Sequence, residues 1–326
     1  MDIAIFSPPE LPLVLRSLTN IAANPDALTP REQQLLQVIA ALHQSDPKIA
    51  ESSTTLSQIA QGIINPHHRK RLLQMAIVMA MVDGETTPHQ QKALRSLATA
   101  LSVHEQGLRV LQEAASGHQM LARFDMMRRM MSKIVVPALH EEGIAGVKKI
   151  VEPLFFKGGD DPAVAQKYHQ LGQLPPGTLG YAFWEHYTQN HFPFPGEAGG
   201  IPERLVFHDL GHILSGYDTS PEHEIQQGAF QAGFMRHDGF TFLLFVILQF
   251  HWGLKITPVA DPSEGLFDIP LVLHAVQRGA ACKIDLSDRW NFWEVVDQPL
   301  EELRDRYGIP PFCPPSLPKS LFYSTL

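Results

Sequence analysis

The sequence predicts an all-α protein made of two helical domains, the second of which carries a metal site on a helix-turn-helix. Three observations support this fold class: apolar residues recur at helical spacing, Thr-Pro and Ser-Pro pairs mark helix starts, and strand signals are too few for a large sheet. A chain of 326 residues is longer than most single domains, so two cores are expected.

The composition fits a folded protein that does not bind nucleic acid. Apolar residues make up 44% of the chain and charged residues 18%, which is enough for a packed interior. The net charge of −8 repels phosphate backbones, so no nucleic-acid partner is expected. The two cysteines, Cys282 and Cys313, lie far apart in sequence, as is usual in a reducing compartment. The first residues include Asp2 and Glu10 rather than a basic leader, so a cytoplasmic location is expected.

Two similar helix starts lie in the first half of the chain. Thr29-Pro-Arg-Glu32 and Thr87-Pro-His-Gln90 each place Thr at the N-cap, Pro at the first helical position and an acid or amide at the third. The intervening pattern Met79-Ala-Met-Val-Asp83-Gly-Glu85, followed by the second start, resembles the TerB-like helical domains of tellurite resistance. This resemblance covers about residues 10–150 and implies a helical bundle with Asp83 and Glu85 near a metal. The residues themselves favour solvated acids at a helix junction.

A turn-rich stretch separates the two predicted domains. Residues 157–163 read Lys-Gly-Gly-Asp-Asp-Pro-Ala, a composition that breaks helices. The sequence therefore predicts one domain over residues 1–155 and a second over residues 156–326.

The second half contains the strongest candidate for a chemical site. His208 and His212 are four residues apart and therefore share a helical face, and Asp209 lies three before His212. Ser220 and Pro221 start the next helix and place Glu224 in its first turn. Two nitrogen and two oxygen donors suit zinc and also permit iron or manganese. The spacing is not that of a zinc peptidase, which needs Glu directly after the first His.

The same residues carry a second resemblance. His208-Asp-Leu-Gly-His212, eleven residues and then Glu224 is similar to the HDxxH-x11-E motif of the Coq-four ubiquinone-biosynthesis family. Further landmarks over about residues 165–315 agree with it: Pro176-Gly177, Trp184, Arg278-Gly279, Trp293-Glu294 and Pro299-Leu300. The resemblance implies that His208, Asp209, His212 and Glu224 are the ligands of one divalent ion. It also implies work on the polyprenyl-benzoate to quinol pathway, with peripheral membrane contact and other quinone-biosynthesis enzymes as partners.

The functional expectation is a quinone-biosynthesis protein that binds a divalent metal, zinc first, and a polyprenylated ring intermediate. It acts as an enzyme if it removes the ring carboxyl group, oxidatively or not, with Glu224 or Asp209 available as the catalytic group for proton transfer. The alternatives are a non-catalytic lipid-binding scaffold and a metal-dependent phosphohydrolase of the HD type, which needs His and Asp ligands at other spacings.

Three further patterns have a structural and a functional interpretation. The apolar helix over residues 240–254 is too short to span a membrane, and it is either plain core or the wall of a channel for an isoprenoid tail. The methionine run between residues 120 and 131, interleaved with arginines, is either core or a surface for a membrane or partner. Three residues are candidates to support the metal ligands: His251, His274 and Arg278.

Overall fold

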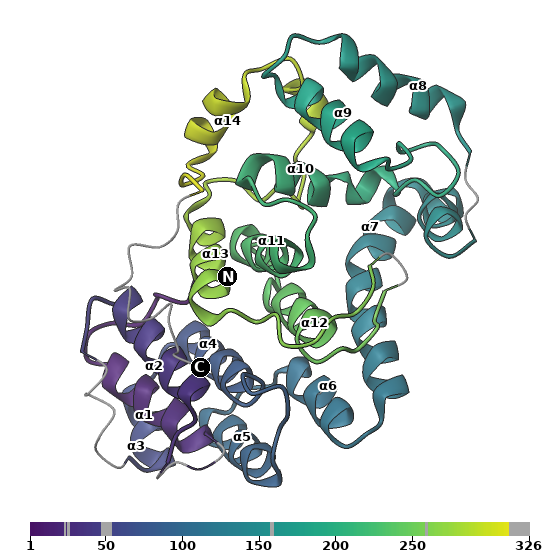
Figure 1. The fold of residues 1–326 in the computed structure, drawn as a ribbon. Helices are drawn as coiled ribbons and strands as arrows, with labels where there is room; N and C mark the ends of the chain where they lie inside the picture. The colour runs from purple at the N-terminus through teal and green to yellow at the C-terminus, as the bar shows by residue number, and fades with distance from the viewer. Residues whose placement is uncertain (23, 25–26, 47–53, 157–159, 258–259, 313–326) are drawn as a thin grey trace.

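The computed structural model describes residues 1–326 except 23, 25–26, 47–53, 157–159, 258–259 and 313–326. The described residues form fourteen α-helices and no β-strand, which confirms the all-α prediction. The first five helices gather at one end of the molecule (Figure 1): α1 (Leu11–Ile21), α2 (Pro30–Leu42), α3 (Leu56–Gly62), α4 (Pro66–Met79) and α5 (Pro88–Leu101).

Two of these helices begin as the sequence predicts. The Thr29 hydroxyl accepts a hydrogen bond from the backbone of Glu32, and the Thr87 hydroxyl accepts one from the backbone of Gln90. In both cases the side chain of the third helical residue also accepts a hydrogen bond from the N-cap backbone, so both capping boxes are present.

A short and a long helix lead from this end to the rest of the chain. α6 (Gln106–Ala115) is followed by α7 (Gln119–Phe156), which packs against α6 and runs along one side of the molecule (Figure 1). α7 is interrupted at Gly143, whose φ of 65° and ψ of −150° are not helical. Glycine tolerates this conformation because it has no Cβ, so α7 consists of two helical segments that meet at a kink.

The C-terminal half is built around one central helix. Its elements are α8 (Pro162–Gln170), α9 (Leu179–Asn190), α10 (Val206–Ser215), α11 (Pro221–Phe234), α12 (Phe240–Phe250), α13 (Ile269–Ala281) and α14 (Leu300–Tyr307). α11 lies in the middle of this group (Figure 1) and contacts α10, α12 and α13. All its residues from Ile225 to Phe234 are buried.

Close contact between α11 and α13 depends on two glycines. A Cβ at Gly279 would lie 2.0 Å from the carbonyl oxygen of Phe230, and one at Gly233 would lie 2.2 Å from the carbonyl oxygen of Val276. The absence of side chains lets the two backbones approach, and this fixes the position of α11.

The two halves of the chain are in direct contact. α2 packs against α13, and Arg31 donates hydrogen bonds to the carbonyls of Val82 and Phe267 at 2.6 and 2.7 Å. The indole of Trp252 donates to the carbonyl of Met81 at 3.1 Å. Most of the buried apolar side chains of the described residues belong to one cluster that includes both halves. The border between residues 155 and 156 stays a prediction; it falls in the last turn of α7, and residues 157–159 lie outside the described residues.

Among the described residues, no helix is both long and apolar enough to cross a lipid bilayer. The most apolar helix, α12, has eleven residues and is buried over most of its length.

Candidate metal centre

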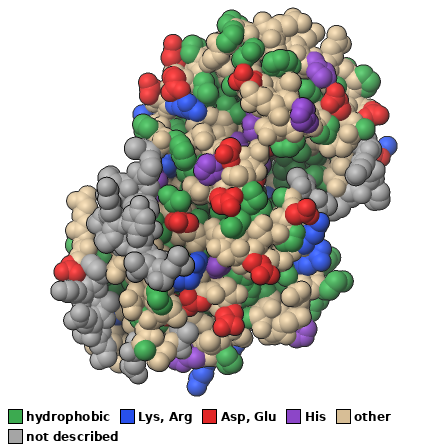
Figure 2. Space-filling view, viewed as in Figure 1, with side chains coloured by type: hydrophobic (Ala, Val, Ile, Leu, Met, Phe, Trp, Pro, Cys, Tyr) green, Lys and Arg blue, Asp and Glu red, His purple; other side chains and the backbone are tan. Residues whose placement is uncertain are grey.

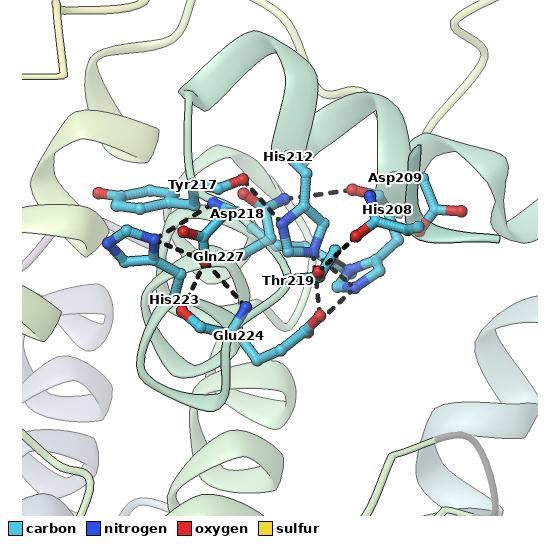
Figure 3. Close-up of polar contacts among 12 residues, drawn as sticks. His208, Asp209, His212, Tyr217, Asp218, Thr219, His223, Glu224 and Gln227 are labelled. Atoms are coloured by element: carbon cyan, nitrogen blue, oxygen red, sulfur yellow. Dashed lines mark hydrogen bonds and ion pairs between the residues drawn. The ribbon is translucent and has the colours of Figure 1, made fainter. Parts of the chain in front are cut away.

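His208, His212 and Glu224 converge at the crossing of α10 and α11 (Figure 3). The Nε2 atoms of the two histidines are 3.4 Å apart. The carboxylate of Glu224 lies 3.6 Å from His208 Nε2 through one oxygen and 3.5 Å from His212 Nε2 through the other. Among the described residues, this is the one group of three or more His, Cys, Asp or Glu side chains close enough to share an ion.

Each imidazole is oriented by a hydrogen bond on its other nitrogen. His212 Nδ1 lies 3.1 Å from the carbonyl oxygen of Tyr217, which can only accept, so Nδ1 carries the proton. His208 Nδ1 donates to Gln231 Oε1 at 2.9 Å. Both Nε2 atoms therefore face the same point and are the ring nitrogens available to a metal ion, in the orientation that metal-binding histidines adopt.

The separations are close to those of a shared metal site. Bonds of about 2.0–2.2 Å at tetrahedral angles place neighbouring ligand atoms about 3.3–3.6 Å apart. The two Nε2 atoms are 3.4 Å apart, and each lies 3.5–3.6 Å from a different oxygen of Glu224. With one ligand atom taken from each residue, all three atoms lie within 4.8 Å of one another. Two imidazole nitrogens and a carboxylate are donors that suit zinc.

The electrostatics of the group favour a positive charge at its centre. Burial acts to raise the pKa of Glu224, but hydrogen bonds with His208 and His212 hold it well below its ordinary value. Burial acts to lower the pKa of His208, but the bond to Glu224 and its charge raise it to about 9. A carboxylate that stays ionised and holds a proton on its neighbour also attracts a metal cation, which displaces that proton on binding.

A glycine and a glutamine set the distance between α10 and α11. Gln227 of α11 donates to the carbonyl of His208 at 3.3 Å and accepts a bond from Ser215 at 2.8 Å. A Cβ at Gly211 would lie 2.2 Å from Gln227 Nε2. Gly211, between the two histidines, therefore leaves room for the glutamine that ties the helices together.

The start of α11 differs in detail from the prediction. The helix begins at Pro221 with Ser220 at the N-cap position and Glu224 in the first turn, as expected. The Ser220 hydroxyl makes no capping bond and donates to Asp218 Oδ1 at 2.5 Å. Asp218 precedes the helix and competes for the hydroxyl, which the short motif does not reveal.

Asp209 is separate from the three converging groups. Its carboxylate points away from Glu224 (Figure 3) and accepts a hydrogen bond from the Tyr187 hydroxyl of α9. Burial and the charge of Asp209 raise the pKa of Tyr187 well above its ordinary value, so the phenol keeps its proton. The structure thus brings together three of the four predicted ligands and places Asp209 beside them.

The three converging groups lie on the wall of a cavity of about 610 Å³, the metal-side cavity. Met127, Met130 and Met131 of α7 line it, as do Phe242 and Phe245 of α12. Asp209 also faces it. On the face seen in Figure 2, hydrophobic side chains line a hollow beside the helices α8–α10. The volume lies within the range of about 300–1,000 Å³ of small-molecule sites.

The cavity bears on two sequence patterns that had both a structural and a functional interpretation: the apolar helix over residues 240–254 and the methionine run between residues 120 and 131. Phe242 and Phe245 line it, whereas Leu248 is in the core and Trp252 contacts the N-terminal half. Met126 is fully buried, but Met120 is 79% exposed, so the methionine run is neither wholly core nor wholly surface.

Of the three groups named from the sequence, two bond to backbone carbonyls and not to the ligand side chains, and for His274 the proposed support stays a prediction. His251 Nε2 donates to the carbonyl of Val82 at 3.0 Å, and Arg278 donates to the carbonyls of Ser215 and Pro310. The direct supports are Gln231 and the Tyr217 carbonyl. No sequence pattern indicates His186, whose ring stacks at 6.1 Å from that of His212 and whose buried Nε2 has no hydrogen-bond partner.

The acids of the TerB-like pattern have another environment. Both carboxylate oxygens of Asp83 lie 3.0–3.1 Å from the Thr29 hydroxyl. Neither Asp83 nor Glu85 belongs to the group of converging ligands found among the described residues.

No protein-family model matches the chain, and no curated protein is significantly similar to it. The two family resemblances therefore rest on the residues that carry them.

Proposed function

We propose that the protein binds one divalent ion, zinc, through His208, His212 and Glu224, next to the substrate that the metal-side cavity holds. The supporting observation is the convergence of two Nε2 atoms and a carboxylate, with one ligand atom of each within 4.8 Å of the others, on the wall of an apolar cavity. Three protein ligands with an open fourth position are typical of catalytic zinc, whereas structural zinc has four.

The proposed substrate is a prenylated aromatic acid of quinone biosynthesis. Its carboxylate or phenolate needs a compensating cation, because an unpaired charge is costly in an apolar site. The side chains of Phe242, Phe245 and three methionines offer an apolar surface for the ring and the nearest part of the tail. The HDxxH-x11-E motif supports the same substrate class by resemblance.

The proposed reaction is loss of the ring carboxyl group. The bond between the ring carbon and the carboxyl carbon breaks, CO₂ leaves and a proton takes its place on the ring. A bound zinc ion supplies a Lewis acid for this chemistry. Asp209, hydrogen-bonded to Tyr187 and facing the cavity, is the group available for proton transfer. A phosphohydrolase of the HD type would need additional His and Asp ligands. Among the described residues, no other group of three or more His, Cys, Asp or Glu side chains lies close enough to share an ion.

Metal content tests the ion directly. Elemental analysis of the purified protein should give about one divalent ion per chain, and His212→Ala should lose most of it because the substitution removes one of three ligands. His223→Ala is the matched control, since His223 precedes Glu224 but pairs with Asp218 at 2.9 Å. Equal metal content in the two variants would refute the site.

Cells that produce only Glu224→Gln test the reaction. This variant removes the charge of the carboxylate and keeps its size. We expect such cells to accumulate a prenylated aromatic acid and to contain less finished quinone, as measured by mass spectrometry of lipid extracts. Normal quinone content with a folded variant would favour the scaffold alternative, and normal content in a complete deletion would exclude both.

A further inference from the structure

A second cavity, of about 850 Å³, lies on the other side of α7. Its walls come from the N-terminal residues Met1, Asp2 and Ile5, from α4, from the start of α6 and the residues just before it, from α7, and from the segment 235–240 that joins α11 to α12. It shares no lining residue with the metal-side cavity. Arg128, Arg129, Ser132 and Lys133 of α7 face it, so two of the arginines interleaved with the methionines line a different cavity from the methionines.

Positive charge predominates around this space, the basic cavity. It is lined by six lysines or arginines: Lys70, Arg71, Arg128, Arg129, Lys133 and Arg236. The acids that line it are half as many: Asp2, Glu105 and Asp238. This local excess occurs in a protein whose net charge is −8, so it is not a consequence of overall composition.

The acids do not satisfy the buried guanidinium groups. Arg129 is only 6% exposed, and one of its nitrogens, Nη2, contacts Thr241 at 2.8 Å, Glu105 at 3.6 Å and Asp238 at 3.7 Å. Its Nε and Nη1 atoms are buried without a hydrogen-bond partner. Buried N–H groups that lack an acceptor are costly.

A second arginine, Arg71, also has a buried N–H group without an acceptor. Arg71 donates through Nη1 to Gln74 at 2.8 Å, while its buried Nε has no partner. Burial lowers the pKa of Arg71 to about 10, against the opposing charges of Asp2 and Glu105. Lys70 is 4.0 Å from Glu105, and Lys133 is 3.3 Å from Asp238, so the nearby acids are already shared among several cations.

We infer that the basic cavity binds a small phosphate-bearing molecule. Guanidinium groups recognise phosphate through several N–H donors at once, and a multiply charged anion would balance the excess of basic over acidic side chains that line the cavity. The cavity is larger than a single phosphate group requires, which leaves room for an organic part.

Calorimetric titration with inorganic pyrophosphate at constant ionic strength tests this inference. We expect the intact protein to bind pyrophosphate, and Arg71→Gln and Arg129→Gln each to weaken binding about tenfold or more through loss of charge-assisted hydrogen bonds. Arg123→Gln is the matched control, because Arg123 is an exposed residue of α7 that does not line the cavity. If the buried Arg129 is needed for folding, the half-buried Arg71 still decides the result.

Two more titrations distinguish the basic cavity from the metal centre and from a site that accepts any anion. The His212→Ala variant should bind pyrophosphate as the wild type does, because pyrophosphate should bind in the basic cavity and not to a zinc ion in the metal-side cavity. That result would show that the two proposals are independent. Citrate, a carboxylate anion, should bind more weakly than pyrophosphate. No binding to the intact protein, unchanged binding in both arginine variants, loss of binding in His212→Ala, or stronger binding of citrate would each overturn the inference.

Discussion

At the scale of single residues, the proposed metal centre depends on groups outside the three ligands. Gln231 and the Tyr217 carbonyl each accept a hydrogen bond from Nδ1 of one imidazole, which leaves Nε2 facing Glu224. Without these bonds, each ring could rotate or place its proton on Nε2, where it would block coordination. The three ligands are therefore sufficient only with their two partners in place.

Replacement of Gln231 tests this dependence. Gln231→Leu keeps the approximate volume but removes the acceptor for His208 Nδ1, so zinc affinity should fall by about 10–100-fold. Competition with a chromogenic chelator measures the affinity. Gln226→Leu is the control, because Gln226 is buried on the same helix but bonds to the backbone of Glu222. Equal affinity in both variants would show that the ring of His208 is held by packing alone.

At the scale of helices, the sequence predicts where a helix begins and which residues share one of its faces better than it predicts which helices contact each other. The spacing of His208, His212 and Glu224 follows from helical geometry and one short turn, and it predicts their convergence. Asp209 shows the limit of this reasoning, because its neighbour Tyr187 comes from a different helix. The support by Gln231 is likewise a contact between helices, and no local spacing encodes it. The basic cavity brings together segments from residues 1 to 240, so no single motif contains it.

The contact between α11 and α13 predicts a large effect of one methyl group. In Gly279→Ala the new Cβ would meet the backbone oxygen of Phe230, which cannot move away as a side-chain end can. We expect the free energy of unfolding to fall by roughly 1–3 kcal/mol. Urea denaturation followed by circular dichroism measures it. Ala281→Ser, at an exposed position of α13, should change it little, and a similar small change in Gly279→Ala would mean that the helices separate easily.

At the scale of the whole molecule, the two halves share more than a linker. Arg31, His251 and Trp252 make hydrogen bonds between the N-terminal helices and the C-terminal half. α7, before the predicted border, supplies a wall of the cavity beside the metal centre. Composition and turn signals locate a break in the chain, but they cannot show which surfaces pack across it.

Scanning calorimetry tests how far this packing joins the halves. Because one apolar cluster includes residues of both halves, we expect a single cooperative unfolding transition. The fragment 156–326 should be much less stable than the intact chain, since it lacks α2 and α7. Two separate transitions, or a fragment as stable as the C-terminal half of the intact protein, would support independent domains.

The position of α7 between two cavities restricts how that helix can change. Met127, Met130 and Met131 face the metal-side cavity, which holds the proposed metal ligands, and Arg128 and Arg129 face the basic cavity. Each added residue turns the following part of a helix by about 100°. One residue inserted near the start of α7 would turn charged side chains toward the metal ligands and thioethers toward the acids of the basic cavity, whereas the same insertion before Gln119 would only lengthen a loop. The rotational register of one helix thus sets the chemical character of both cavities at once.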